Sequence, residues 1–185
     1  MTGQTDRRVR RTRERLRDAL VSLSREKPYG EIRITELLAR ADVGRATFYA
    51  HFRDKEDLLI SLFLDMIDHF ERLGLQEDPE AVLPAARGLL RHFHQARDFA
   101  RALARAGKME VLLRACEMRL RRNLEARLPA SAEPPPAITA AVAAGAFTTL
   151  VNQWINAGQQ TPPDDLADAL DRLLAPGVRA AVGCA

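Results

Sequence analysis

The chain has 185 residues, of which 46% are hydrophobic and 29% charged, a balance that indicates a folded, soluble protein and excludes a disordered one. Only 5% of the residues are aromatic, so Leu and Ala must fill most of the core, and such a composition favours helices. The formal net charge of +3 is unevenly placed, because residues 1–60 carry 14 Lys and Arg against 10 Asp and Glu.

Several classes of protein are excluded by what the sequence lacks. The two cysteines, Cys116 and Cys184, have no spacing that predicts a disulfide framework or a metal site. The arginine-rich N-terminus has no apolar run behind it, so no signal peptide is predicted. The most apolar stretch, residues 138–155, is interrupted by polar side chains and is not expected to span a membrane. We therefore expect a cytoplasmic protein with no cofactor, no metal and no membrane partner.

Apolar residues at helical spacing predict an all-α fold of about nine helices, without strands or repeats. The expected helices cover residues 7–26, 34–40, 45–52, 54 to about 73, 81–95, 97–106, 108–128, 137–157 and 161–174. Asp54 is expected to cap the fourth helix. Pro176 and Gly177 are expected to end the last helix and to leave a loose tail.

An arginine run accounts for most of the N-terminal charge, and such a run suits contact with phosphate. Its members are Arg7, Arg8, Arg10, Arg11, Arg13, Arg15 and Arg17. A solvated tail that only aids solubility is an alternative that charge alone leaves open.

The second and third helices are short and are joined by a three-residue turn, Asp42 to Gly44, after a longer helix, which is the plan of a helix-turn-helix. On a helical wheel of residues 45–52, Phe48 and Phe52 share one side and can be buried. The opposite surface has Ala46 and Ala50 in the middle, with hydrogen-bonding residues on both flanks: Arg45, Thr47, Tyr49 and His51. Small residues permit close approach to a groove, while the flanks reach phosphates or base edges. An ordinary amphipathic helix in a bundle is the alternative.

The stretch from Ile34 to Leu59 closely resembles the DNA-binding domain of the TetR/AcrR family of transcriptional regulators. Its most specific part is the run Thr47-Phe48-Tyr49-Ala50-His51-Phe52, followed by Lys55-Glu56 and Leu58. The resemblance covers about residues 7–59. It implies a helix-turn-helix DNA-binding domain at residues 1–53 and a helical domain for effector binding and dimerisation at residues 54–185.

The resemblance also implies which residues meet DNA. Arg45 and Ala46 would face base edges, while Thr47, Tyr49 and His51 would hold phosphates. The full expected set is Thr35, Gly44, Arg45, Ala46, Thr47, Tyr49, His51 and Lys55. Two positions depart from the family pattern: Arg33 stands where Thr is usual, and Asp42 stands where Gly is usual.

A regulator of this kind must dimerise, because two recognition helices must meet half-sites about 34 Å apart. The best candidate interface is the helix at 137–157 together with the last helix, which would form a four-helix bundle with a second copy. Its small and apolar residues are Ala141, Ala144, Gly145, Phe147, Thr148, Val151, Asn152, Trp154 and Ile155. The alternative is that this face packs within the monomer.

Members of the family commonly sense a small molecule between the middle helices. The candidate lining residues are Phe63, Met66, His69, Phe70, His92, Phe93, Phe99, Met109, Leu113 and Cys116. Any one of them could equally belong to the core.

The interpretation is a homodimeric regulator, a repressor in the first instance, that binds a palindromic double-stranded operator and is released by a small-molecule effector. An activator, or control by a protein partner, stays open, as does a basic module that binds nucleic acid without sequence preference. An enzyme is not predicted, because His92 and His94 cannot share a helix face as metal ligands and no phosphate loop or nucleophile motif is present.

Overall fold

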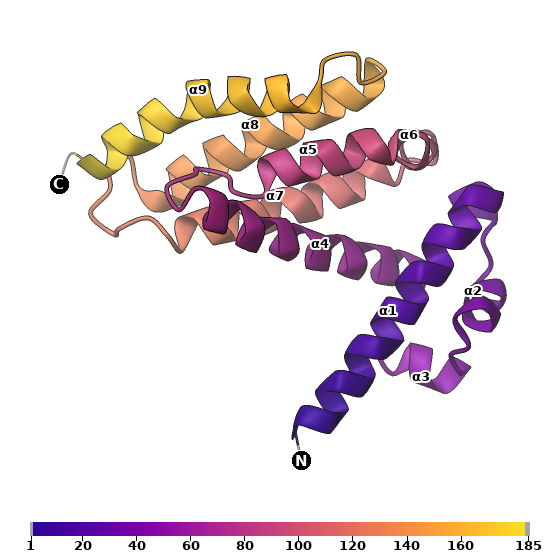
Figure 1. Cartoon of the computed structure of the whole chain (residues 1–185). Helices are drawn as coiled ribbons and strands as arrows, with labels where there is room; N and C mark the ends of the chain where they lie inside the picture. Colours follow the sequence, from indigo (N-terminus) through magenta and orange to yellow (C-terminus); the bar gives the residue numbers. More distant parts are fainter. Residues whose placement is uncertain (1, 184–185) are drawn as a thin grey trace. The chain divides into compact units, whose positions relative to one another are not determined.

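The computed structural model describes the backbone of residues 2–183 and the side chains of residues 9–183. The side chains of Arg7 and Arg8, and the whole of Cys184, therefore lie outside the described residues. Over this range the secondary structure is helical without strands, which confirms the all-α prediction (Figure 1). The elements are α1 (Thr2–Glu26), the 3-10 turn η1 (Tyr29–Glu31), α2 (Ile34–Ala41), α3 (Arg45–Tyr49), α4 (Lys55–Glu77), α5 (Ala86–Gln95), α6 (Arg97–Arg105), α7 (Met109–Glu125), α8 (Pro136–Asn156) and α9 (Pro163–Gly183).

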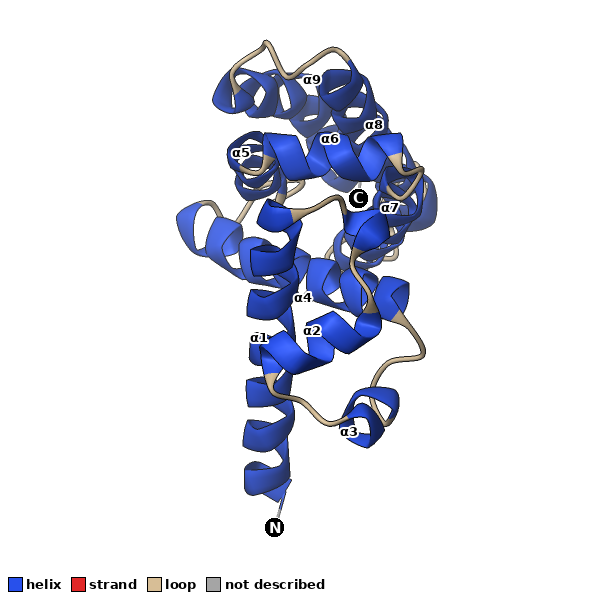
Figure 2. Cartoon of the chain, turned by 90° about the vertical axis from the view of Figure 1, so that its right-hand side faces the viewer, coloured by secondary structure: helices blue, strands red, loops and turns tan. Residues whose placement is uncertain are grey.

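Two compact units make up the chain, Met1–Leu62 and Phe63–Ala185. In the first unit, α1 packs on α2 through side chains spaced three or four residues apart, so that Leu16, Leu20 and Leu23 are buried. Figure 2 shows α2 lying against α1 in this unit, with α3 next in the chain. Because the apolar side chains of each helix lie on one stripe, the opposite stripe of each helix faces outward.

The second unit is a bundle in which α8 packs along α7 and also contacts α6 and α9. The side chains of Phe147 and Val151 on α8 are fully buried. By length and composition alone, α8 could cross a membrane. Nine of its 21 residues are buried in the second unit.

Several helix boundaries differ from those predicted, and two of the differences involve prolines. The helix expected at 81–95 begins only at Ala86, because Pro84 disfavours the helical conformation of the residue before it. The last helix does not end at Pro176 but continues to Gly183. There Ala181 is buried and its carbonyl accepts a hydrogen bond from the Glu133 amide at 3.0 Å, so tertiary contacts outweigh the proline.

Candidate nucleic-acid interface

The side chains that anchor α3 are those that the helical wheel placed on its inner side. Phe48 is fully buried and Phe52 nearly so, with their ring centroids 5.6 Å apart. The ring of Tyr49 meets that of Phe48 edge to face at 5.2 Å, while Tyr49 itself is half exposed. The prediction that Phe48 and Phe52 hold this helix to the core is confirmed.

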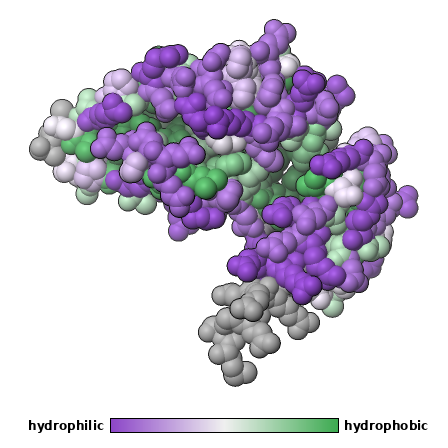
Figure 3. All heavy atoms as spheres, viewed as in Figure 1, coloured by the Kyte–Doolittle hydropathy of each residue, from purple (hydrophilic) through white to green (hydrophobic). Residues whose placement is uncertain are grey.

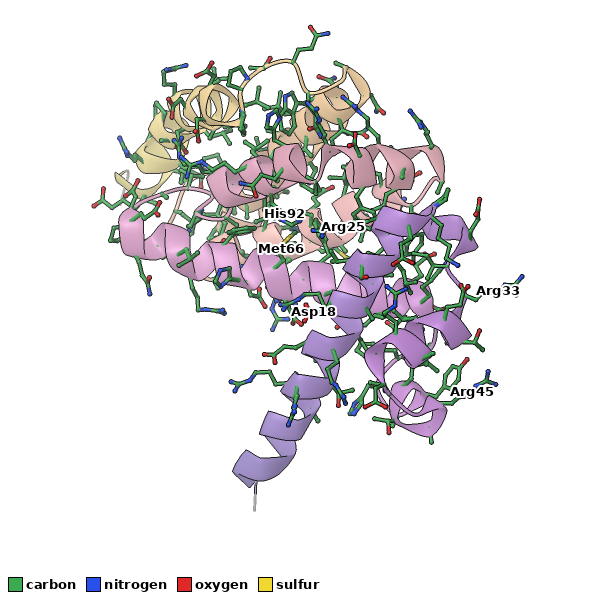
Figure 4. All side chains as sticks on the ribbon, turned by 45° about the vertical axis from the view of Figure 1, so that its right-hand side comes forward. Asp18, Arg25, Arg33, Arg45, Met66 and His92 are labelled. Atoms are coloured by element: carbon green, nitrogen blue, oxygen red, sulfur yellow. The ribbon has the colours of Figure 1, made fainter. Side chains whose placement is uncertain are left out.

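The outer side of α3 is solvent-exposed, including its two small residues. Figure 4 shows the Arg45 side chain pointing away from the unit. The α-helix itself ends at Tyr49, earlier than predicted, but the amides of His51 and Phe52 still bond back to the Phe48 carbonyl at 2.9 Å. The structure thus brings one exposed surface together from Arg45, Ala46, Thr47, Tyr49, Ala50 and His51, which we call the recognition surface.

The turn before α3 depends on Asp42, which adopts a left-handed backbone conformation with φ 49° and ψ 52°. Its amide and that of Val43 bond back into the last turn of α2, which closes that helix. Arg15 on α1 donates to the Asp42 carboxylate at 2.7 Å and to the Asp42 carbonyl at 3.2 Å. Asp42 therefore performs the helix-ending role of a glycine, with Arg15 fastening the turn to α1.

Substitutions at Asp42 should separate these two contributions. We expect Asp42→Ala to be about 1 kcal/mol less stable than Asp42→Gly, because only glycine adopts this conformation without steric cost. Urea denaturation followed by far-UV circular dichroism measures the difference. Equal stabilities for the two variants would show that the backbone conformation of residue 42 is unimportant.

Lys55, at the start of α4, is engaged within the protein. Its ammonium donates to the carbonyls of Tyr29 at 2.6 Å and of Ile32 at 2.7 Å, and it lies 4.3 Å from the centroid of the Tyr29 ring. In return, the Tyr29 hydroxyl donates to the Lys55 carbonyl at 3.2 Å. Burial raises the pKa of Tyr29 and the carboxylates of Glu56 and Asp54 raise it further, so the phenol stays protonated and can donate. Lys55 thus fastens the α1–α2 connection to α4.

The N-termini of α2 and α4 are both capped by acidic side chains. Glu36 accepts a hydrogen bond from the Arg33 amide at 3.0 Å at the start of α2, and Lys27 donates to the same carboxylate at 2.6 Å. Asp54 accepts one from the Asp57 amide at 2.8 Å at the start of α4, as predicted. Because Glu36 provides the cap, the Arg33 side chain is left to point outward, as Figure 4 shows, beside an exposed Thr35.

The arginine run divides into two groups. Arg13 donates to the Ser61 hydroxyl and its guanidinium lies 5.9 Å from the centroid of the Phe52 ring, while Arg15 holds Asp42. These two arginines support the helix-turn-helix. Arg10, Arg11 and Arg17 are solvent-exposed instead.

Comparison with known proteins assigns this geometry to a family. The model of bacterial regulatory proteins of the tetR family matches residues 16–62, which contain α2, α3 and the first turns of α4. The match covers 47 of the 185 residues, so this part of the chain is similar to the N-terminal domain of the tetR family of bacterial regulatory proteins.

Two relatives from Bacillus subtilis (strain 168) match part of this chain. The uncharacterized HTH-type transcriptional regulator YxbF is 41% identical over 71 residues, which are 36% of this chain and 19% of that protein. The fatty acid metabolism regulator protein is 33% identical over 79 residues, which are 41% of each chain. The matches thus span a fifth and two fifths of these relatives.

One solved structure resembles nearly the whole chain. The dihydroxyacetone kinase operon activator DhaS superposes with a TM-score of 0.63, covering 91% of this chain and 96% of that one. At 18% sequence identity, this likeness establishes the fold alone.

The predicted effector residues differ in how far they are buried. Phe63, Phe93, Met109, Leu113 and Cys116 are packed in the core of the second unit, His69 is exposed, and Phe99 is half-buried. Burial raises the pKa of the Cys116 thiol, which keeps it protonated. Figure 4 shows Met66 and His92 lying inside the second unit. Phe70 and His92 of the predicted set line one groove.

This groove has a volume of about 210 Å³ and lies between the end of α4 and α5. Its apolar lining includes Phe70, Leu73 and Pro84. Figure 3 shows hydrophobic atoms among hydrophilic ones on one face of the second unit. Its polar lining includes Arg87, Arg91, His92 and Gln95. Burial lowers the pKa of His92, so the imidazole is neutral at pH 7.

Glycines bring the walls of the groove together. A Cβ atom on Gly74 would lie 2.0 Å from the Pro84 carbonyl oxygen, and one on Gly88 would lie 2.4 Å from the Phe70 ring. A larger residue at Gly74 would require the Pro84 backbone to move, and one at Gly88 would require the Phe70 side chain to move. No periodic signal in the sequence indicates this close approach, although both glycines stand inside helices.

Two arginines of the groove also hold α9. Arg87 donates to Asp168 at 2.6 Å and to Asp164 at 3.2 Å, and Arg91 donates to Asp164 at 2.8 Å. The hydrogen bonds from Arg91 and Arg87 keep the pKa of Asp164 below its usual range. The acidic side of α9 is thereby directed toward α5.

The interface predicted on α8 is largely wrong. Most of its residues lie in the core of this same chain, namely Ala144, Phe147, Thr148, Val151, Trp154 and Ile155. The small residues permit the close packing of α7 on α8, and the Trp154 indole donates to the Thr161 carbonyl at 2.9 Å. Ala141 and Gly145 are half-buried and Asn152 is exposed, so only these three remain accessible.

Proposed function

We propose that the protein binds a palindromic operator as a homodimer and that the recognition surface of α3 enters the major groove. The observation that carries this proposal is the contrast across one short helix, fully buried at Phe48 and exposed at Arg45 and Ala46. A surface with small residues at its centre can approach base edges closely. In this arrangement Arg45 contacts bases, while Thr47 and Tyr49 bind phosphates.

The test is selection of bound duplexes from a random DNA pool at near-physiological salt. Enrichment of an inverted repeat supports a dimeric, sequence-specific regulator. Binding that collapses with salt and enriches no sequence would support the non-specific basic module instead.

Substitution of Arg45 tests the base-contacting role. Arg45→Ala should weaken binding to the selected sequence by roughly 1–3 kcal/mol and relax the preference at one base position. Tyr49→Phe should weaken binding to selected and scrambled duplexes alike, because a phosphate contact carries no sequence information. Fluorescence anisotropy with both duplexes makes the comparison. If Arg45→Ala weakens both duplexes equally, the base contact is wrong.

For dimerisation we propose an outer face formed by Ile138 and Val142 on α8 and Leu173 on α9. These large apolar side chains are 55%, 62% and 78% exposed. Ile138 and Val142 are four residues apart, so they share the side of α8 away from its core. On α9 the acidic side faces α5, whereas Leu173 is directed to solvent. A second copy would cover this face as a four-helix bundle.

For regulation we propose a cytoplasmic repressor that a small molecule releases by binding in the groove between α4 and α5. The groove has a volume of about 210 Å³. It suits a compact ligand with an apolar part against Phe70 and Leu73 and a hydrogen-bonding part at His92 or Gln95. Isothermal titration with candidate metabolites, repeated with Gly88→Val, tests the site because the added side chain displaces Phe70.

A further inference from the structure

Helix α1 is longer than its contacts with the rest of the first unit require. Its buried residues begin at Leu16, and Arg13, bonded to Ser61, is its most N-terminal described tie to α4. The helix nevertheless starts at Thr2. Eleven residues precede Arg13, which at 1.5 Å per residue gives an extension of about 16 Å. We call residues 2–12 the arm.

The arm extends past the recognition helix. Because Arg13 lies over the ring of Phe52, which follows α3, that arginine marks the level at which α3 ends. Figures 1 and 2 both show the first turns of α1 running alongside α3 and ending beyond it. Arg11 and Arg10 precede Arg13 by two and three residues, about 3 and 4.5 Å along the helix axis, so they lie near the level of α3 and beside the groove that α3 would enter.

Most of the net positive charge of the first unit is on the arm. Residues 2–12 contain four arginines and one aspartate, whereas residues 13–62 contain ten basic and nine acidic residues. Several of those ten are engaged with protein groups, namely Arg13, Arg15, Lys27, Arg40 and Lys55. Phosphate neutralisation dominates the affinity of proteins for DNA. The body of the unit is close to neutral, so the arm is where this charge is available.

We propose that the arm is a second DNA-contacting element, in which Arg10 and Arg11 bind the phosphate backbone beside the sequence that α3 contacts. The position of these phosphates rests on the proposed function, because the contact of α3 with the major groove determines where the arm lies on the DNA. Both arginines are exposed, and the ion pair of Arg10 with Glu14, at 3.8 Å, is solvent-exposed and weak. That pair is exchanged for a phosphate on binding.

The test compares Arg10→Ala/Arg11→Ala with a matched control, Arg17→Ala/Arg25→Ala, which removes the same charge from the part of α1 that packs on α2. Binding of the full chain to a duplex with the selected sequence, and to a scrambled one, is measured between 50 and 200 mM salt. Loss of two phosphate contacts should make the slope of log affinity against log salt shallower by about 1.8 per arm. The Arg10→Ala/Arg11→Ala variant should lose the same factor of affinity for both duplexes. Its protection of DNA from hydroxyl radicals outside the inverted repeat should disappear.

The proposal is overturned if the arm variant and the control change the salt slope equally, or if the arm variant keeps the outer protection. Circular dichroism checks that both variants are folded. Failure of the α3 proposal gives a different result. In that case no sequence is preferred, and Arg45→Ala does not change the ratio of the affinities for the selected and scrambled duplexes. The salt slope on scrambled DNA still tests the arm in that case.

Discussion

Replacing Val142 or Leu173 by glutamate is expected to convert the protein to a monomer and to lower operator affinity by roughly 100-fold or more, since the avidity of two linked half-sites is lost. Both side chains are more than half exposed in the single chain, so the substitutions should not disturb its fold. In the proposed dimer the same positions are covered, and a buried unpaired carboxylate costs several kcal/mol. Light scattering after size exclusion gives the mass, and anisotropy gives the affinity.

Val111→Glu is the matched control, because Val111 is an exposed apolar residue on α7 outside the outer face. It should leave both the mass and the affinity unchanged. A wild-type protein that runs as a monomer would contradict dimerisation. If the Val142→Glu protein stays dimeric, the interface must lie on another surface.

Lys55→Met is expected to lower the free energy of unfolding of the DNA-binding domain by about 2–4 kcal/mol. The variant keeps the aliphatic stem but leaves the carbonyls of Tyr29 and Ile32 without their charged donor, and it removes the cation–π contact. Hydrogen exchange of the peptide spanning residues 27–41 should accelerate. Thermal unfolding of the full chain gives the stability.

The same variant decides between two roles for Lys55. If its main contact were with DNA phosphate, Lys55→Met would leave exchange and unfolding unchanged and would weaken DNA binding only. Arg53→Met serves as the control, because Arg53 is exposed and pairs only loosely with Asp57, at 3.6 Å. That substitution should change stability little.

The recognition helix could be predicted because its constraints are local. Four-residue spacing alone put Phe48 and Phe52 on the inner side, and the structure buries both. Asp54 was likewise identified as a cap from its position before a helix. The role of Lys55 could not be predicted in this way, because its partners Tyr29 and Ile32 lie more than twenty residues away in sequence.

The interface on α8 shows why a composition argument is ambiguous. A stripe of small residues permits close approach of some helix, and the sequence does not say whether that helix is α7 of the same chain or α8 of another. Ala144 and Thr148 are covered by their own chain. The exposed fractions of Ile138 and Val142 distinguish packing within the chain from packing against a second copy. Such fractions depend on how the whole bundle packs, which the sequence alone does not give.

The double engagement of Arg87 and Arg91 links the groove to α9. Both arginines line the groove, and both are held by the carboxylates of Asp164 or Asp168. A ligand that draws Arg91 toward itself must weaken its bond to Asp164 and loosen α9 from α5. Thermodynamic reciprocity then requires that whatever fixes α9 in place lowers the affinity of the groove by the same factor. If dimerisation fixes α9, the dimer should bind the ligand more weakly than the monomer. The apparent ligand affinity should then change with protein concentration.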